Sequence, residues 1–401
     1  MASSTKSHKV AFFLSGQEGG GLAVETKLLC KNLDRNYFKV VGIFCSPGPY
    51  FKEADLGLDQ LVLTDIGLPR QMQIIEGDKW RHSKWAMIKN LGWFTRAVIK
   101  LSNFLKKNNV ELVHSNGGYL NLIADIAAKK AGAKSIWHLR GLFSQDVPMR
   151  IYGGPLGAII SLCTDQFVGI SRSVVDSMPA LWKKKAVLVY DGIDFDELDA
   201  KSDDTWLRNQ LGIEKDRPVI GTVGLVVPIK GHRDFIEMVN IVHKNLPEAL
   251  FIVIGSPVKA SADYAEQMHD LVNLYGLGDC FRWMGDVAGA SRYLGGLDIL
   301  VSATVPPGEG FGLTMVEAMG QGVPVVATCC GAGPELVPDG KAGFIVAANS
   351  PEKLAEAILK LLGNKNLCKQ MGEYGRKWSR KTFDIKITTD KVEQLYLKLL
   401  D

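Results

Sequence analysis

Short apolar runs alternate with segments of helical length along all 401 residues of this chain. That alternation is typical of parallel sheets with helices on both faces. Because the chain is too long for one ordinary hydrophobic core, we expect two α/β domains of about 200 residues each. The expected strands are 10–14, 40–44, 111–114, 134–137, 166–170 and 187–190 in the first half, and 219–223, 250–254, 281–283, 299–301, 325–328 and 344–346 in the second.

Both halves begin with an apolar strand that leads into a glycine-bearing turn, so we interpret them as two Rossmann-like domains. Apolar runs stop and acidic residues gather between Gly192 and Asp216, which indicates the boundary. The predicted organisation is a first domain over residues 1–195, a second over 196–380 and a closing segment over 381–401. The apolar spacing in that closing segment predicts a helix over 388–400.

The composition, 46% hydrophobic and 22% charged, indicates a globular protein. Apolar runs stay below the ~18 residues that a membrane-spanning helix needs. The residues from Met1 to His8 lack the apolar segment of a secretory signal. Seven cysteines without metal-ligand spacing indicate reduced thiols. We therefore expect a cytoplasmic protein.

Residues 79–110 carry eight Lys or Arg and no Asp or Glu. Trp80, Trp85, Trp93 and Phe94 are interleaved with these cations. Such a segment can lie on an anionic membrane surface, or form an ordinary helix whose aromatic side chains pack under a sheet. A nucleic-acid partner is not expected, because no recognised binding module accompanies the basic residues.

Residues 308–320 form a glycine-bearing loop followed by a helix that we expect to begin near Gly312, between two predicted strands. The free N–H groups at the start of such a helix favour an anion such as a phosphate. Glu309 then lies in the loop and Glu317 on the second helical turn. Two carboxylates beside an anion pocket suit a ligand with central phosphates and hydroxyls at both ends, as in a nucleotide sugar. The alternative is a capped helix that carries two unrelated glutamates.

The segment from Glu309 to Glu317 resembles the two-glutamate signature of the retaining glycosyltransferases of family 4. The segments 322–327, 333–337, 339–340 and 343–344 also resemble the family. The resemblance therefore covers most of residues 219–345, and it is weaker in the first half. It implies the α/β fold called GT-B, in which two Rossmann-like domains with doubly wound parallel sheets face each other across a cleft. It also implies a last helix that crosses back to the first domain.

The same resemblance assigns roles to residues. Glu317 would hold the ribose hydroxyls, Glu309 the hydroxyls of the donor sugar, and Lys230 together with the backbone of 311–314 the diphosphate. We expect Glu309 and His138 to form the catalytic set. The expected donor-binding residues are Gly20, Gly21, Lys230, Gly310, Phe311, Gly312, Leu313, Thr314 and Glu317.

In the first half, Gly19–Gly21 follow the first strand and open a predicted helix at 22–33, matching the family's first glycine loop. This turn permits close approach of a diphosphate or an acceptor, or is simply a tight turn. His138 ends a predicted strand; in the family a His here contacts the donor sugar, and the alternative is a loop-capping His. Arg140 either meets a phosphate or pairs with an acid.

Leu225 stands where the family has an Arg that clamps the diphosphate together with the Lys at 230. Either Arg233 or another cation substitutes, or the donor is unusual, or activity is reduced. Asp194 and Asp196 form an Asp-x-Asp motif in the linker, where we do not expect a metal site, and no zinc-ligand spacing occurs.

We therefore predict a metal-independent, retaining glycosyltransferase without a cofactor, acting by front-face attack. It would move a sugar from a nucleotide sugar to a glycan, lipid-linked or small-molecule acceptor, with donor and acceptor meeting between the domains. It would be cytoplasmic, with residues 79–110 as a peripheral membrane contact. Two alternatives stay open: a non-catalytic nucleotide-binding relative, suggested by Leu225, and a dinucleotide oxidoreductase, weakened by the missing Gly-x-Gly-x-x-Gly fingerprint.

Overall fold

A computed structural model describes residues 7–16, 21–46, 56–63, 66, 73–76, 79–82, 84–116, 120–143, 154–214 and 216–401, with the backbone alone for 63, 73–76, 79–82 and 84–88. The chain forms two compact units. The first comprises residues 1–170, 175–189 and 388–401, and the second 171–174 and 190–387. The units thus divide between Val189 and Tyr190, where the sequence analysis put the division after residue 195.

The first unit is built on a seven-stranded parallel sheet in the order β3-β2-β1-β6-β7-β8-β9. Its strands are β1 (His8–Leu14), β2 (Phe38–Phe44), β3 (Gln60–Leu63), β6 (Leu112–Ser115), β7 (Lys134–Leu139), β8 (Gln166–Gly169) and β9 (Ala186–Leu188). Its longer helices are α1 (Gly21–Asn32), α3 (Lys84–Lys107), α4 (Leu120–Ala131), α6 (Pro155–Cys163) and α17 (Ile385–Leu400). The short helix α8 (Ala180–Lys183) also belongs to this unit, whereas the short helix α7 (Arg172–Ser177) is shared, since residues 171–174 are assigned to the second unit.

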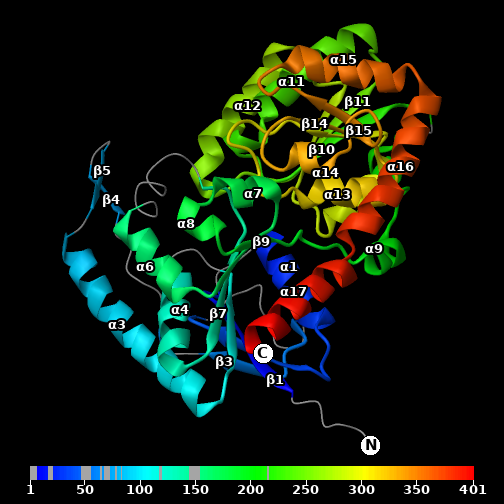
Figure 1. Cartoon of the computed structure of the whole chain (residues 1–401). Helices are drawn as coiled ribbons and strands as arrows, with labels where there is room; N and C mark the ends of the chain where they lie inside the picture. Colours follow the sequence, from blue (N-terminus) through cyan, green and yellow to red (C-terminus); the bar gives the residue numbers. More distant parts are fainter. Residues whose placement is uncertain are drawn as a thin grey trace, which may run out of the picture. The chain divides into compact units, whose positions relative to one another are not determined.

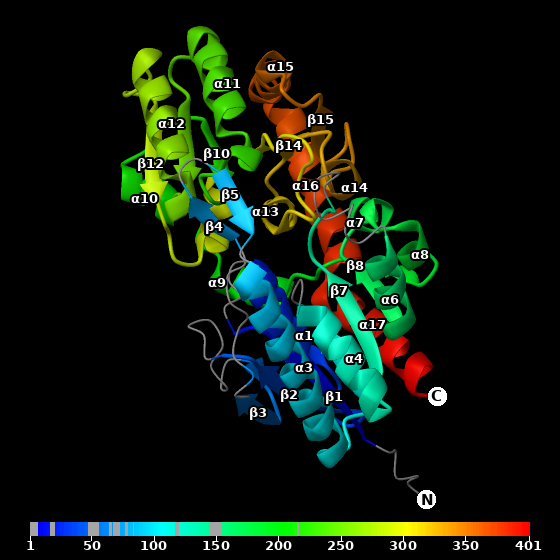
Figure 2. The same ribbon diagram turned by 90° about the vertical axis from the view of Figure 1, so that its left-hand side faces the viewer.

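Strand β1 shows why helices cover both faces of this sheet, because successive side chains of a strand point to opposite faces. Phe12 packs in one hydrophobic cluster with Leu29 of α1 and Tyr396 of α17. Phe13 packs in the other with Leu101 of α3, and Figure 2 shows α3 and α4 side by side along that face. The closing helix α17 therefore belongs to the first unit's core (Figure 1).

The second unit has a six-stranded parallel sheet in the order β12-β11-β10-β13-β14-β15. Its strands are β10 (Val219–Val223), β11 (Leu250–Ile254), β12 (Phe281–Gly285), β13 (Ile299–Ser302), β14 (Val325–Thr328) and β15 (Gly343–Val346). Its helices are α9 (Phe195–Lys201), α10 (Trp206–Leu211), α11 (His232–Asn245), α12 (Ala262–Leu274), α13 (Leu313–Gly320), α14 (Gly333–Leu336), α15 (Pro351–Leu362) and α16 (Lys365–Phe383). Short 3₁₀ turns occur at Pro228–Lys230, Lys259–Ser261 and Ala290–Gly296.

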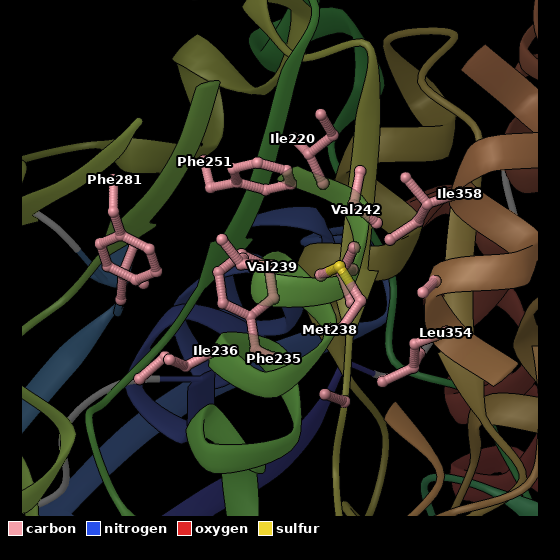
Figure 3. Packing of buried hydrophobic residues seen from close by; sticks show 14 of the residues in the cluster. Ile220, Phe235, Ile236, Met238, Val239, Val242, Phe251, Phe281, Leu354 and Ile358 are labelled. Carbon is pink, nitrogen blue, oxygen red and sulfur yellow. The ribbon is translucent and has the colours of Figure 1, made fainter. Parts of the chain in front are cut away.

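The core of the second unit lies between the sheet and the helices α11, α12 and α15. Figure 3 shows Phe235 of α11 beside Phe251 of β11, with Leu354 and Ile358 of α15 at the same cluster. All four side chains are fully buried. The apolar face of each helix thus fixes it on the sheet, which sets the position of the loops at the strand ends.

Every strand that the sequence predicts is present, with bounds within two residues. The edge strand β3 was missed because it is only four residues long, with Gln60 exposed and Leu61 and Val62 partly buried, so alternation is weak. The antiparallel pair β4 (Gln73–Glu76) and β5 (Lys79–His82) was missed as well, because the basic residues of 79–110 suggested one continuous segment. That segment is a strand followed by the helix α3.

Within α3, Trp93 and Phe94 pack against the core, and the Trp93 Nε1–H donates to the Ile66 carbonyl at 2.8 Å. For these two side chains the interpretation as core aromatics is confirmed; those of Trp80 and Trp85 lie outside the described residues. None of the helices in the described part of the chain combines the length and apolar character that crossing a bilayer requires.

Candidate functional site

The strand order of the second sheet reverses between β10 and β13, since β11 lies on one side of this pair and β14 on the other. In open parallel sheets, ligands bind outside the carboxyl ends of the strands at such a reversal. The chain leaving β10 carries Lys230, and the chain leaving β13 carries Glu309. The topology therefore brings together two residues that the sequence analysis singled out 79 positions apart.

Lys230 and Glu309 form an ion pair, in which the Lys230 ammonium donates to Glu309 Oε2 at 2.6 Å. The hydroxyl of Thr304 donates to the other carboxylate oxygen at 3.0 Å. Both charged side chains are 22% exposed, so neither is sealed from a ligand. Gly224 makes room for this arrangement, because a Cβ there would lie 3.1 Å from Lys230 Cε.

The loop before α13 is held by the loop after β14. The Ala332 N–H donates to the Glu309 carbonyl at 3.1 Å, and a Cβ on Gly331 would lie 2.2 Å from that same carbonyl oxygen. Gly331 therefore has to be glycine. Gly331 lets the two backbone segments touch and so fixes the position of Glu309.

Helix α13 begins directly after this loop, with Gly312 as its N-cap in a left-handed conformation (φ 114°). No side chain caps the helix, so the amides of Leu313 and Thr314 at its start have no intrahelical acceptor. Phe311 is buried between the rings of Tyr190 and Phe383, at 6.1 and 5.7 Å. Its side chain thus anchors the loop that carries Gly310.

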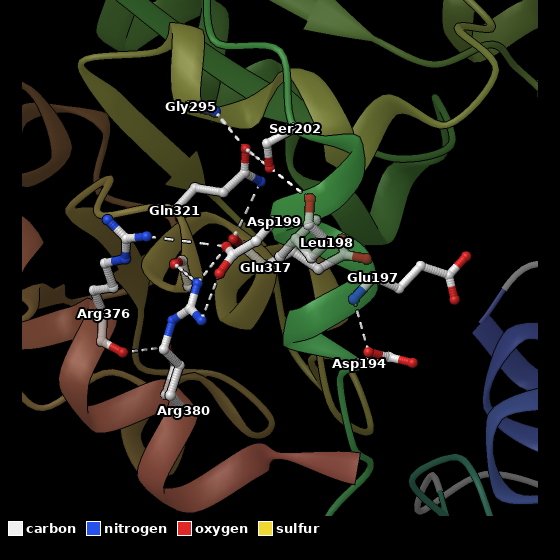
Figure 4. Close-up of polar contacts among 12 residues, drawn as sticks. Asp194, Glu197, Leu198, Asp199, Ser202, Gly295, Glu317, Gln321, Arg376 and Arg380 are labelled. Carbon is white, nitrogen blue, oxygen red and sulfur yellow. Dashed lines mark hydrogen bonds and ion pairs between the residues drawn. The ribbon is translucent and has the colours of Figure 1, made fainter. Parts of the chain in front are cut away.

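Glu317 lies one turn into α13, and burial raises the pKa of its carboxyl group to about 7. Among the described residues, nothing donates a hydrogen bond to this carboxylate. Its backbone carbonyl accepts from the side chain of Gln321, which also ties Ser291 and Gly295 to the helix (Figure 4). Gln321 therefore links α13 to the segment that contains Ser291 and Gly295, while the carboxylate of Glu317 can still accept hydrogen bonds.

The far end of α13 is clamped by Arg380 of α16. Its guanidinium donates to both carboxylate oxygens of Asp199, at 2.9 and 2.5 Å, and to the Gly320 carbonyl at 3.1 Å (Figure 4). Arg380 also lies 5.0 Å from the ring centroid of Phe195. This contact network joins α9, α13 and α16, so the orientation of α13 is set by packing rather than by a ligand.

The Asp-x-Asp pair has structural partners. Asp194 caps α9 by accepting from the Glu197 N–H at 2.8 Å, and Asp196 accepts from Lys386 at 2.8 Å. Across the part of the chain that the structure describes, no three His, Cys, Asp or Glu side chains are grouped so as to hold a metal ion.

In the first unit, the strand order reverses between β1 and β6, and polar residues follow β6 and β7. His138 is the last residue but one of β7 and is 2% exposed; its Nδ1 is hydrogen-bonded to His114 Nε2 at 3.0 Å. Burial lowers the pKa of His138 well below its usual value, with a further contribution from Arg140. The Arg140 Nε–H donates to Asn116 Oδ1 at 3.4 Å.

Asn116 was missed by the sequence analysis. It is 3% exposed and its Nδ2 has no acceptor among the described residues. Its place after a predicted strand, as a neighbour of the strand that ends in His138, was the available signal. Of the first glycine loop, Gly20 lies outside the described residues, and Gly21 is the exposed first residue of α1.

Leu225, which stands where the family has an Arg, and Arg233, the candidate substitute, are both exposed. Leu225 is 50% exposed, which leaves room for a longer side chain. Arg233, in the first turn of α11, is 55% exposed, and its guanidinium lies 3.9 Å from Glu237. An exposed pair of this kind is weak, so Arg233 is able to exchange Glu237 for another anion.

Residues 203–378 match the family model described as glycosyl transferases group 1. The chain is 28% identical over 170 residues to the GDP-mannose-dependent alpha-(1-6)-phosphatidylinositol monomannoside mannosyltransferase of Mycobacterium tuberculosis, covering 41% of this chain and 43% of that protein. It is 31% identical over 199 residues to D-inositol 3-phosphate glycosyltransferase of Corynebacterium jeikeium, covering 48% and 46%.

Among solved structures, HepE of Anabaena in complex with UDP superposes with a TM-score of 0.78 at 17% identity, over 97% of this chain and 100% of that one. The fold is therefore that of the GT-B glycosyltransferases, with two Rossmann-like domains. The matches to the mycobacterial and corynebacterial relatives span less than half of those proteins. Residues 203–378, the part that matches the glycosyl transferases group 1 model, include Lys230, Glu309 and Glu317.

The pH dependence of stability tests the environment of Glu317. Its pKa is about 7 in the folded protein, against 4.5 for an ordinary carboxyl. The folded state therefore holds this proton more tightly than the unfolded chain. The stability contributed by this group is complete below pH 4.5 and is lost as the pH rises through about 7. Glu317→Gln removes the titration, so relative to the wild type it should gain about 1–3 kcal/mol of unfolding free energy between about pH 4.5 and pH 8.

Urea denaturation of both proteins at the two pH values measures this difference. Glu352→Gln, at an exposed position in the first turn of α15, is the matched control and should show no such gain. If the free energy of unfolding changes between the two pH values by the same amount in Glu317→Gln, Glu352→Gln and the wild type, the carboxyl of Glu317 is not desolvated.

Proposed function

We propose that this chain, whose residues 203–378 are those of a group 1 glycosyltransferase, transfers a sugar from a nucleotide-sugar donor to an acceptor. The observation that carries the proposal is the set of groups at the reversal between β10 and β13. The Lys230 ammonium follows β10. The Glu309 carboxylate, the N-terminus of α13 and the Glu317 carboxylate follow β13. Cationic and N–H groups match phosphates, and carboxylates match sugar hydroxyls.

In this proposal, Lys230 and the amides of Leu313 and Thr314 bind the diphosphate. Glu309 accepts hydrogen bonds from the donor sugar, and Glu317 from the ribose. The Lys230–Glu309 contact supports this division of roles, because in a nucleotide sugar the outer phosphate and the sugar are directly bonded. In the first unit, His138 and Arg140 supply N–H donors, with Gly20 and Gly21 near the ligand. Arg233 remains a candidate second cation.

The proposed reaction retains the configuration of the sugar by front-face attack. The acceptor oxygen forms its bond to the anomeric carbon on the face that the diphosphate leaves, and a departing phosphate oxygen takes the acceptor proton. A covalent double displacement is disfavoured in this proposal, because both glutamates are assigned to binding the donor. The protein then supplies positioning and charge stabilisation. Lys230 and the start of α13 neutralise the leaving diphosphate, so divalent metal is not required.

A panel of nucleotide sugars tests the proposal. Incubation with UDP-glucose or GDP-mannose should release the nucleoside diphosphate, followed by coupled assay, and excess EDTA should leave the rate unchanged. Loss of turnover in EDTA with recovery on adding magnesium would contradict metal independence. Absence of both turnover and thermal stabilisation by every nucleotide sugar would contradict the assignment as a transferase. Oxidation or reduction of a nicotinamide cofactor would instead favour a dinucleotide oxidoreductase.

The role of Glu317 is tested by nucleotide affinity. Glu317→Ala removes a charged acceptor for the ribose hydroxyls, so binding of UDP or GDP should weaken by about 1.5–3 kcal/mol. Isothermal titration calorimetry measures the change, and Glu352→Ala, at the exposed position used above, is the control. Equal affinities for the wild type and Glu317→Ala would show that the ribose is held elsewhere.

Leu225 decides between an active enzyme and a non-catalytic nucleotide-binding relative. Because Leu225 is half exposed, Leu225→Arg adds a cation without burying it. If Lys230 alone neutralises the diphosphate, nucleotide-sugar binding should tighten by about 1.5–3 kcal/mol. Unchanged or weaker binding, together with a loss in Arg233→Ala, would show that Arg233 already fills this role. Tight nucleotide binding without donor hydrolysis in either protein would favour the non-catalytic relative.

We also propose that the acceptor is a glycan, a lipid-linked sugar or a small molecule, and that α3 contacts the anionic surface of a membrane from the cytoplasmic side. The exposed face of α3 combines Arg96, Lys100, Lys106 and Lys107 with Leu91 and Ile99, which are 69% and 44% exposed. Basic and apolar side chains on one helix face suit anionic headgroups.

Co-sedimentation with vesicles tests this contact. The protein should bind vesicles rich in phosphatidylglycerol and not vesicles of phosphatidylcholine. Arg96→Glu/Lys100→Glu should weaken binding by about 1 kcal/mol or more for each reversed charge. Lys365→Glu/Lys369→Glu on α16 makes the same charge change at exposed positions of the second unit. If both double variants lose binding equally, net charge rather than α3 drives the association.

A further inference from the structure

Three buried side chains of the first unit form a continuous hydrogen-bonded row. Tyr396 of α17 is hydrogen-bonded through its hydroxyl to His114 Nδ1 at 2.6 Å, and His114 Nε2 to His138 Nδ1 at 3.0 Å. Tyr396 and His114 are fully buried, and His138 is 2% exposed. The ring of Phe12 stacks on His114 at 4.8 Å, so its imidazole has a fixed orientation.

The protons in this row can be placed from the partners available. Among the described residues, His114 Nδ1 is the one acceptor within reach of the Tyr396 hydroxyl. A buried hydroxyl needs an acceptor, so Tyr396 donates to His114. A neutral imidazole carries one N–H, which for His114 is then on Nε2 and donates to His138 Nδ1. The remaining ring proton of His138 is accordingly on Nε2.

The titration of the three groups agrees with this assignment. Burial lowers the pKa of His114 to about 3 and holds that of His138 well below its usual value, with Arg140 acting in the same direction on both. Burial also raises the pKa of Tyr396 well above its usual value. Both imidazoles are therefore neutral and the phenol keeps its proton throughout the physiological range.

We propose that Tyr396 and His114 are positioning residues that hold His138 in its Nε2–H tautomer, so that His138 offers a hydrogen-bond donor to an oxygen of the ligand. This inference rests on the proposed function. His138 Nε2 is buried and has no partner among the described residues, as expected of a donor kept for a ligand. His138 is thereby excluded as a general base, because its Nδ1 already accepts from His114.

Asn116 points to the same ligand chemistry. The Arg140 Nε–H donates to Asn116 Oδ1, which fixes the amide orientation and leaves Nδ2 as a second buried donor without an acceptor. Asn116 follows β6 and His138 is the last residue but one of β7, and these strands are neighbours in the sheet. The carboxyl edge of the first sheet thus offers N–H groups, which recognise the lone pairs of a hydroxyl or phosphate oxygen.

Nitrogen-15 NMR of the imidazoles tests the tautomers directly on the full chain without any nucleotide sugar. Signals are assigned with His114→Gln and His138→Gln. Wild-type His114 and His138 should each show a protonated Nε2 and an unprotonated Nδ1. Tyr396→Phe removes the donor and should convert His114, and with it His138, to a mixture of tautomers. A wild-type His138 protonated on Nδ1, or an unchanged pattern in Tyr396→Phe, would overturn the proposal.

Kinetics separate this role from a merely structural one. Tyr396→Phe should lower kcat for nucleotide-sugar turnover on the order of tenfold, the size of one hydrogen bond, and leave KM unchanged. Val392→Ala, one turn earlier in α17 and in the same cluster, is the packing control and should change neither the NMR pattern nor kcat. Equal kcat losses in both variants would assign Tyr396 to packing alone. If wild-type His114 and His138 both carry their proton on Nε2 but no nucleotide sugar is turned over, the proposed function is contradicted, whereas the proposed hydrogen-bonded row is supported.

Discussion

Parallel strands end at one edge of their sheet, and this constraint places the candidate functional residues of both units. Lys230 and Glu309 follow the strands on either side of the reversal in the second sheet. Asn116 and His138 stand at the ends of neighbouring strands in the first. Because the strands themselves are buried and apolar, polar side chains are placed where the strands end. The topology that forms the core therefore also brings the candidate functional residues together at the carboxyl edge of each sheet.

The electrostatics of the second unit depend on how α13 is held. Arg380 fixes its last residue through the Gly320 carbonyl, and the packing of Gly331 on Glu309 fixes the loop before it. Because both ends are secured by protein contacts, the free amides at the start of the helix are oriented before any anion arrives. Preorganised dipoles of this kind stabilise developing charge without reorganisation, which is what a leaving diphosphate requires.

Much of the fold and part of the site could be predicted from the sequence. Strands β10, β11 and β14 have the predicted bounds because each is a short apolar run between turn residues. Glu309 and Glu317 were placed correctly, on a loop and a helix, because the spacing of eight residues and the glycines define both. The contact between Lys230 and Glu309 could not be foreseen, since it arises from strand order. Tyr396 and Asn116 were missed for the same reason: their partners are far away in the chain or on a neighbouring strand.

Buried polar atoms without a hydrogen-bond partner indicate where a ligand binds. Burying a polar atom without a hydrogen bond costs about 1–3 kcal/mol, so a marginally stable protein keeps few such atoms. His138 and Asn116 in the first unit carry this cost. In the second unit, Lys230 and the amides at the start of α13 are groups that bind phosphate oxygens. In the first unit, His138 Nε2 and Asn116 Nδ2 are buried donors without an acceptor among the described residues. Each unit by itself therefore favours a ligand rich in oxygen atoms, because an oxygen acceptor would satisfy these groups.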